Sequence, residues 1–228
     1  MSLLTPNDLG AIGLSLRVAA AAVLFTLPLA TLAALALARG RFPGKTLFSA
    51  AVYLPLVLPP VATGYALLVM FGRQGVIGAA LAKIGIVLSF SWSGAALAAG
   101  VMAFPLLVGP IRLSIEAIDR EIDEVALTLG ASRLKRFFRV TLPLAAPGIL
   151  AGAVLGFAKA LGEFGATITF VGAIPGVTLT LPSAIHGATQ TPGAEGRALA
   201  LCAVAALLAI VSVLAFDLVS RWAARRVA

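Results

Sequence analysis

Five long apolar stretches dominate this sequence and limit the folds that are open to it. An α-helix needs about 20 mostly apolar residues to cross the hydrocarbon core of a bilayer, and each stretch is long enough. The stretches cover residues 12–38, 47–71, 92–111, 144–171 and 198–216. Arg17 lies near the start of the first, whose apolar run is too long for the core of a signal peptide, so we expect a retained helix.

The composition excludes a water-soluble domain. Hydrophobic residues make up 61% of the chain and charged residues 11%, whereas charged residues are near a quarter of a soluble domain. Within 228 residues, five crossings with short loops leave no room for a separate catalytic domain. We therefore predict an all-α integral membrane protein with about five transmembrane helices, folded as one domain over residues 1–228.

The basic residues lie mainly on alternate flanks of the apolar stretches. One set of flanks carries Arg39, Arg41, Lys45, Arg112, Arg120, Arg133, Lys135, Arg136, Arg139, Arg221, Arg225 and Arg226. The opposite flanks carry only Arg73, Lys83 and Arg197. Because cytoplasmic loops retain Lys and Arg, this pattern predicts an N-terminus outside and a C-terminus in the cytoplasm. The net charge of +8 then reflects topology, and no nucleic-acid partner is expected.

Enzyme and metal motifs are poorly supported. The segment from Gly40 to Thr46 resembles a phosphate-binding loop, but three residues separate its glycines where the motif needs four. His186 is the only histidine and Cys202 the only cysteine. We therefore expect no catalytic residues, no metal site and no cofactor bound by this chain.

The loop over residues 112–143 is amphipathic in two pieces. Its first apolar face has helical spacing and consists of Ile118, Ile122, Val125 and Leu129. Gly130 then provides a helix end, and Ser132 a start for a second apolar face with Leu134, Phe137 and Phe138. On pattern alone, this helix, glycine, helix arrangement fits either a docking element or a helical pair lying on the membrane surface.

The same loop contains Glu124, Val125, Ala126, Gly130, Val140, Leu142 and Pro143 at the spacing EVA-x3-G-x9-V-x-LP. This pattern resembles the EAA loop of ABC importer permeases, with valine for the second residue and for the isoleucine. The resemblance implies that the loop, through Glu124, Ala126, Gly130, Leu142 and Pro143, couples to a separate ATPase subunit. ATP and Mg would be bound by that partner.

Further motifs are similar to those of the molybdate permeases along nearly the whole chain. They are FPGK at 42–45, LPLVLPP at 54–60 with Gly64 and Tyr65, GEFGATITFV at 162–171, IPG at 174–176, LPS at 181–183 and QTPG at 190–193. This resemblance implies a type I ABC importer (MetI-like) permease fold in the bacterial plasma (inner) membrane. It also implies a homodimer that works with two ATP-binding subunits and an extracytoplasmic molybdate-binding protein.

Two alternatives stay open. Permeases for tungstate and for sulfate or thiosulfate share these motifs, so the cargo is less constrained than the importer class. A stand-alone channel or ion-coupled carrier is the rival from a different class. It would need its own intramembrane ion sites and often an internal repeat, and neither is evident.

Polar and helix-breaking residues inside the apolar stretches mark a candidate translocation pathway or gate. Prolines at 55, 59 and 60 predict a kink in the second stretch, either facing the pathway or serving packing alone. Lys159 and Glu163 lie four residues apart, a spacing that predicts a pair which either neutralises itself or borders the pathway. Thr167 and Thr169 would then offer hydroxyls to an oxyanion.

Two further features leave their role open. Gly148, Gly152 and Gly156 form a small-x3-small repeat on which another helix can pack closely, within the chain or between two copies. The segment 172–197 is rich in proline and glycine but also apolar, so we expect it to be partly buried. It is either an ordinary outer loop or a re-entrant, gate-lining segment.

Overall fold

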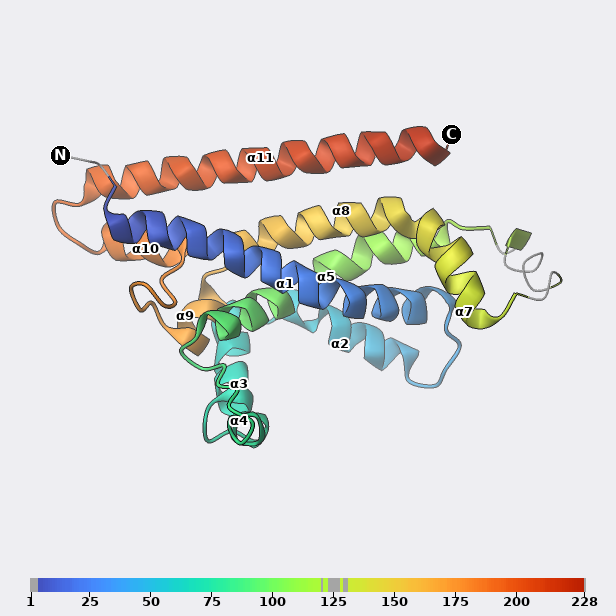
Figure 1. Ribbon diagram of the computed structural model, residues 1–228, viewed down its shortest axis with the longest axis horizontal. Coiled ribbons are helices and arrows are strands. Elements are labelled where there is room, and N and C mark those ends of the chain that lie inside the picture. The colour runs from blue at the N-terminus through green and yellow to red at the C-terminus, as the bar shows by residue number, and fades with distance from the viewer. Residues whose placement is uncertain (1–3, 120, 123–127, 129–130, 228) are drawn as a thin grey trace.

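The computed structural model describes residues 4–119, 121, 122, 128 and 131–227, and this part of the chain is built from helices without any β-strand (Figure 1). Four long helices run along the long axis of the molecule: α1 (Pro6–Arg39), α5 (Trp92–Glu116), α8 (Leu142–Leu161) and α11 (Glu195–Val227). The shorter helices are α2 (Lys45–Val57), α3 (Pro60–Phe71), α4 (Val76–Ala82), α7 (Arg133–Arg136), α9 (Gly165–Val171) and α10 (Leu181–Thr189), with a π-helical turn, η1 (Phe137–Thr141).

The structure contains helices that are long and apolar enough to span a membrane, in about the predicted number. Four helical stretches are long and apolar enough to cross: Pro6–Arg39, Trp92–Glu116, Leu134–Leu161 and Glu195–Leu218. The pair α2 and α3 makes a fifth candidate, bent by 114° at the break between them. The prediction of an all-α membrane protein with about five crossings is therefore correct.

Two of the predicted stretches are not continuous helices. The second stretch, residues 47–71, is two helices that meet at a sharp angle, because Pro59 and Pro60 both lack the N–H that a continuing helix needs. The fourth stretch, residues 144–171, ends as a helix at Leu161, and a separate helix, α9, starts at Gly165. Both breaks fall inside runs that hydropathy alone treats as continuous.

The core is built around α5, which packs against α1 and α8. Small residues line these contacts: Ala99 and Ala103 of α5 and Ala19 of α1 are fully buried. A Cβ placed on Gly100 would lie 2.8 Å from Cγ2 of Thr26 on α1. Small residues allow the helix backbones to come close, which increases van der Waals contact. This contact matters in a membrane because the hydrophobic effect does not drive helices together in lipid.

The glycine repeat of α8 packs within the chain, against α5. A Cβ on Gly152 would lie 2.8 Å from the carbonyl oxygen of Leu107, and a Cβ on Gly156 would lie 2.7 Å from a methyl carbon of the same leucine. Gly148 is similarly close to Ser114 and to the carbonyl of Pro110. The structure thus decides in favour of packing inside one subunit.

One end of the bundle, hereafter the α10 end, is closed by α10 and the first turns of α1 and α11 (Figure 1). Asp8 of α1 accepts hydrogen bonds from Arg197 of α11, with a shortest N···O distance of 2.6 Å, and its side chain is fully buried. Ser15 Oγ accepts from the backbone N–H of Leu181 at 2.7 Å. The segment 172–197 is therefore partly buried as predicted, through the helix α10 that it contains.

Candidate functional site

The two helix breaks lie next to each other, because α3 packs along α9. Glycines make this contact possible. A Cβ on Gly64 of α3 would lie 2.5 Å from the carbonyl oxygen of Ala166, and a Cβ on Gly165 would lie 2.7 Å from Cβ of Pro60. Neither neighbour can move away cheaply, since one is backbone and the other a rigid ring. The structure thus brings Pro60 to the start of α9, beside the break that contains Glu163.

The first break has a simple cause in the sequence. Leu58 (φ −68°, ψ 141°) and Pro59 (φ −54°, ψ 132°) are both extended, as residues that precede a proline tend to be. Pro60 then occupies the first position of α3, where a missing N–H costs nothing. Pro55 lies inside α2 and does not make the break. Pro59 and Pro60 are exposed on the surface of this single chain.

The second break is organised by Glu163. Its Oε2 lies 2.9 Å from Lys159 Nζ, and its Oε1 accepts a hydrogen bond from the backbone N–H of Ala166 at 3.0 Å. The carboxylate therefore caps the first turn of α9 while it pairs with a cation at the end of α8. Glu163 is 3% exposed, whereas the side chain of Lys159 is 32% exposed. The lysine side chain is thus partly open at this break, whereas the carboxylate is closed off.

The predicted contact between Lys159 and Glu163 forms, but on a different backbone from the one expected. The spacing predicts a pair on one continuous helix face, whereas Gly162 ends α8 between the two residues. The backbone N–H of Glu163 donates to the carbonyl of Ala160, a tightened turn that closes the helix. The pair therefore bridges the end of α8 and the start of α9.

The two threonine hydroxyls turn towards their own helix. Thr167 Oγ1 donates to the carbonyl of Phe164 at 2.9 Å, and Thr169 Oγ1 donates to the carbonyl of Gly165 at 2.8 Å. Thr167 is 2% exposed. In this conformation neither hydroxyl hydrogen is available to an oxyanion, so the role predicted for these threonines would require a rotation of the side chain.

Thr63 is a polar residue at this site that the sequence reasoning missed. It is 7% exposed, it precedes Gly64 at the α3–α9 contact, and its Oγ1 has no hydrogen-bond partner among the described residues. The available signal was its position, three residues after two consecutive prolines and next to the glycine of a close helix contact. Buried hydroxyls without a partner are uncommon and tend to mark sites that rearrange or bind.

The opposite end of the molecule carries the predicted coupling loop. Glu124, Ala126 and Gly130 lie outside the described residues. Leu142 and Pro143 start α8, which continues from α7 through η1 as one helical stretch, Leu134–Leu161. In η1 the backbone N–H of Leu142 bonds to the carbonyl of Phe137, five residues back, a π-type bond just before the proline that cannot donate.

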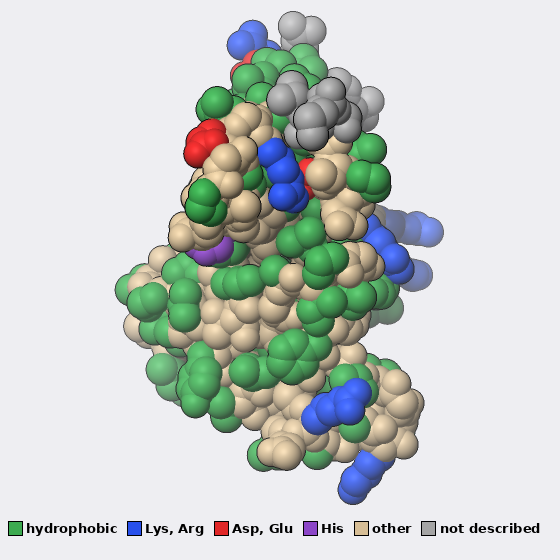
Figure 2. Space-filling model, turned by 90° about the vertical axis from the view of Figure 1, so that its left-hand side faces the viewer, with side chains coloured by type: hydrophobic (Ala, Val, Ile, Leu, Met, Phe, Trp, Pro, Cys, Tyr) green, Lys and Arg blue, Asp and Glu red, His purple; other side chains and the backbone are tan. Residues whose placement is uncertain are grey.

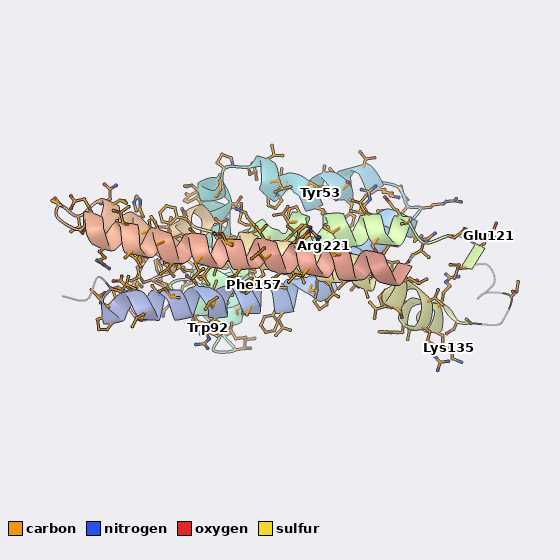
Figure 3. All side chains as sticks on the ribbon, turned by 90° about the horizontal axis from the view of Figure 1, so that it is seen from above. Tyr53, Trp92, Glu121, Lys135, Phe157 and Arg221 are labelled. Atoms are coloured by element: carbon orange, nitrogen blue, oxygen red, sulfur yellow. The ribbon has the colours of Figure 1, made fainter. Side chains whose placement is uncertain are left out.

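Around this loop the structure offers apolar surface and one firm anchor. Leu134 is 71% exposed and Phe138 is 56% exposed, so the second apolar face predicted for the loop is open to a partner or to lipid. Arg39 Nη2, at the end of α1, donates to the carbonyl of Ile118 at 2.7 Å. Figure 3 shows Glu121 and Lys135 at this same end, far from Trp92. The anchor ties α1 to the start of the loop.

Comparison with known proteins identifies relatives along nearly the whole chain. Residues 26–228 match the family described as binding-protein-dependent transport system inner membrane component. The chain is 52% identical to the molybdenum transport system permease protein ModB of Escherichia coli K12, over 98% of this chain and 96% of the relative. It is 51% identical to ModB of Haemophilus influenzae, over 96% of this chain and 94% of the relative.

Among solved structures, the fold is similar to that of a bacterial alginate ABC transporter in complex with an alginate pentasaccharide-bound periplasmic protein. The TM-score is 0.74 at 21% sequence identity, covering 95% of this chain and 79% of the other. At that identity the likeness concerns the fold alone, and it confirms the predicted importer permease architecture.

Proposed function

This chain belongs to the family of binding-protein-dependent transport system inner membrane components, and on that premise we propose that it is the permease subunit of an ABC importer which carries molybdate into the cytoplasm. The observation that carries the proposal is the 52% identity with a molybdenum permease over nearly the full length of both chains. It favours molybdate over the sulfate and thiosulfate alternatives, and an importer over a stand-alone channel or ion-coupled carrier.

Partners follow from the same proposal. Two copies of this chain would form the pathway, because one bundle of four or five crossings is small for alternating access. Two ATP-binding subunits would hydrolyse ATP, and Glu124, Ala126 and Gly130 of the coupling loop would link them to this chain. No catalytic step would take place in this chain. An extracytoplasmic binding protein would deliver the oxyanion, as a periplasmic protein is bound to the structurally similar alginate transporter.

Orientation is part of the proposal as well. The α10 end would face outwards and the coupling loop the cytoplasm. Figure 2 looks at the α10 end and shows mainly hydrophobic and uncharged side chains, with few Lys or Arg. The loop end instead carries Arg39, Arg41 and Lys45 together with the basic loop residues. This asymmetry supports a cytoplasmic C-terminus.

A mechanical path from the coupling loop to the pathway supports the assignment. The helical stretch from Leu134 to Leu161 is continuous up to Gly162, so a displacement of the loop would move α8 with it. The helix ends at Gly162, and beyond it α9 is held by Glu163 and by its contact with α3. Movement of α8 would therefore change the contact between α3 and α9, where the two breaks meet.

The Lys159–Glu163 pair is suited to weak, transient contact with an oxyanion. A free lysine in a low-dielectric pathway would bind a divalent anion too firmly for release, whereas a lysine paired with a buried carboxylate attracts it less. The side chain of Lys159 is about one third exposed, whereas that of Glu163 is almost fully buried. We assign Lys159 to the pathway and Glu163 to holding both the cation and α9 in place.

The proposal is tested by complementation. In a bacterial strain that lacks its own molybdate permease but retains the ATPase and binding protein, expression of this chain should restore cellular molybdenum, measured by mass spectrometry at limiting molybdate. Excess tungstate should compete and excess sulfate should not. Restoration of sulfate uptake without molybdenum uptake would overturn the cargo assignment.

A further inference from the structure

A cleft opens between α1 and α5 on the side of the bundle. It has a volume of about 250 Å³, and its walls are almost entirely apolar. Ala21, Phe25, Trp92 and Leu97 are among the lining residues, and Phe25 is 71% exposed. A chain of methylene groups would find apolar contacts on both walls.

A cation lies against Trp92, one of the residues that line this cleft. The guanidinium carbon of Arg17 lies 3.8 Å from the centre of the Trp92 ring, in a cation–π contact. Trp92 lies at the edge of the molecule beside α1 (Figure 3). Among the described residues no carboxylate or carbonyl pairs with Arg17, which is exposed. The N–H donors of this guanidinium therefore have no acceptor among the described residues.

Two helices independently place this cation at the surface of the hydrocarbon core. On α1 the uncharged run from Val18 to Ala38 spans about 31 Å at 1.5 Å per residue. On α5 the distance from Trp92 to Arg112 is about 30 Å by the same rise. Both lengths match the roughly 30 Å thickness of the hydrocarbon core. Arg17 and Trp92 thus lie together at one membrane interface, with the cleft starting just below them.

We propose that this cleft is a binding site for an anionic phospholipid, with the phosphate on Arg17 and an acyl chain between α1 and α5. Charge complementarity selects the lipid: a planar guanidinium with free donors suits a phosphate, and the cleft below it suits only an apolar chain. Ser93, whose Oγ lies 2.9 Å from Ser91 Oγ, adds a hydroxyl group at the headgroup level. Under the proposed orientation the lipid belongs to the outer leaflet.

The chain contains its own reporter for this site. It has two tryptophans, so Trp222→Phe leaves Trp92 as the only one. The full-length Trp222→Phe protein is reconstituted in vesicles of phosphatidylcholine that contain a set fraction of either phosphatidylglycerol or phosphatidylcholine with brominated acyl chains. Bromine quenches tryptophan fluorescence only on contact, and the ratio of quenching by the two lipids measures their relative affinity at Trp92.

We expect the brominated phosphatidylglycerol to bind about fivefold more tightly than the brominated phosphatidylcholine, the size of effect that one basic side chain near a membrane surface produces. Arg17→Gln should bring that ratio to about one. Lys83→Gln, which also removes an exposed cation, should leave it unchanged. Ala21→Leu should fill the cleft and reduce quenching by both lipids. Arg17→Gln also removes the cation–π contact and so changes the intrinsic fluorescence of Trp92. That change affects both lipids equally and cancels, because each ratio compares the two lipids within one variant.

Three results would overturn the proposal. The first is equal quenching by the two lipids in the Trp222→Phe protein, and the second is a preference that survives Arg17→Gln. The third is no quenching by either lipid, which is the result expected if a second copy of the chain covers the cleft.

Discussion

Lys159 Nζ lies 2.9 Å from Glu163 Oε2, although Gly162 ends the helix of Lys159 before Glu163 is reached. Because Glu163 also caps α9, this one carboxylate joins a long helix that starts at the coupling loop to a short helix packed on α3. The pair is therefore placed where movement of α8 would be passed to α9 and α3.

Removing the cation alone should be more harmful than removing the pair. Lys159→Met leaves a carboxylate that is 3% exposed without its partner, so we expect loss of uptake and a stability loss of roughly 1–3 kcal/mol. Lys159→Met with Glu163→Gln should recover assembly, measured by size-exclusion chromatography and thermal unfolding, but not full uptake. Uptake equal to wild type in the double variant would show that the pair is purely structural.

The contact between α3 and α9 should tolerate no added side chain. In Gly64→Ala the new methyl group would lie 2.5 Å from the carbonyl oxygen of Ala166, so the two breaks must separate. We expect uptake to fall at least tenfold and stability to fall by about 1–3 kcal/mol. Gly13→Ala on α1, where a Cβ meets nothing within 4 Å, is the matched control and should behave as wild type. Normal uptake by Gly64→Ala would contradict the role given to this contact.

Packing of the α8 glycines inside one subunit predicts a defect in folding. Gly152→Val would push a branched side chain into the Leu107 carbonyl on α5. The free energy of unfolding of the isolated chain should therefore fall by roughly 1–3 kcal/mol, seen as a lower unfolding temperature. Gly109→Ala, with open space around its Cβ, should have little effect. A Gly152→Val chain with unchanged thermal stability that fails only to pair with a second copy would place this face between subunits.

Much of this architecture follows from the sequence, and the errors have physical reasons. Apolar length predicts the long helices, because span length is set by bilayer thickness. The break at Gly162 was missed because Phe164, Ala166 and Ile168 continue the apolar run; glycine followed by a buried acid was the signal available. Proline predicts a kink at residue 59 but not its 114° angle, which also depends on packing against α9.

The candidate site was predictable only in part. Helical spacing brought Lys159 and Glu163 together, and the structure confirms the contact. The small-x3-small pattern is the same for a partner helix in the chain and one in a second copy, so only coordinates could decide. The orientation of a hydroxyl has no sequence signature, so the backbone bonds of Thr167 and Thr169 could not be foreseen. The position of Thr63 marked it as a candidate, but its lack of a hydrogen-bond partner could not be read from the sequence.

The proposed orientation predicts which termini and loops reporters can reach. A fusion at Arg226 should be active as a cytoplasmic reporter, and a fusion at Gly75, near the end of the bent pair, should be active as an extracytoplasmic one. The reason is the excess of Lys and Arg on the side of Arg226. Reporters at both positions that give the same side would contradict the topology, since α5, α8 and α11 separate them.

The most direct measurement is molybdate uptake by proteoliposomes that contain the purified chain with its ATPase subunits. We predict uptake of radioactive molybdate that requires both internal ATP and added binding protein, that is competed by tungstate more than by sulfate, and that is at least tenfold lower in Gly64→Ala than in Gly13→Ala. Uptake by this chain without the ATPase or without ATP would contradict the account, because it would mean a channel or ion-coupled carrier.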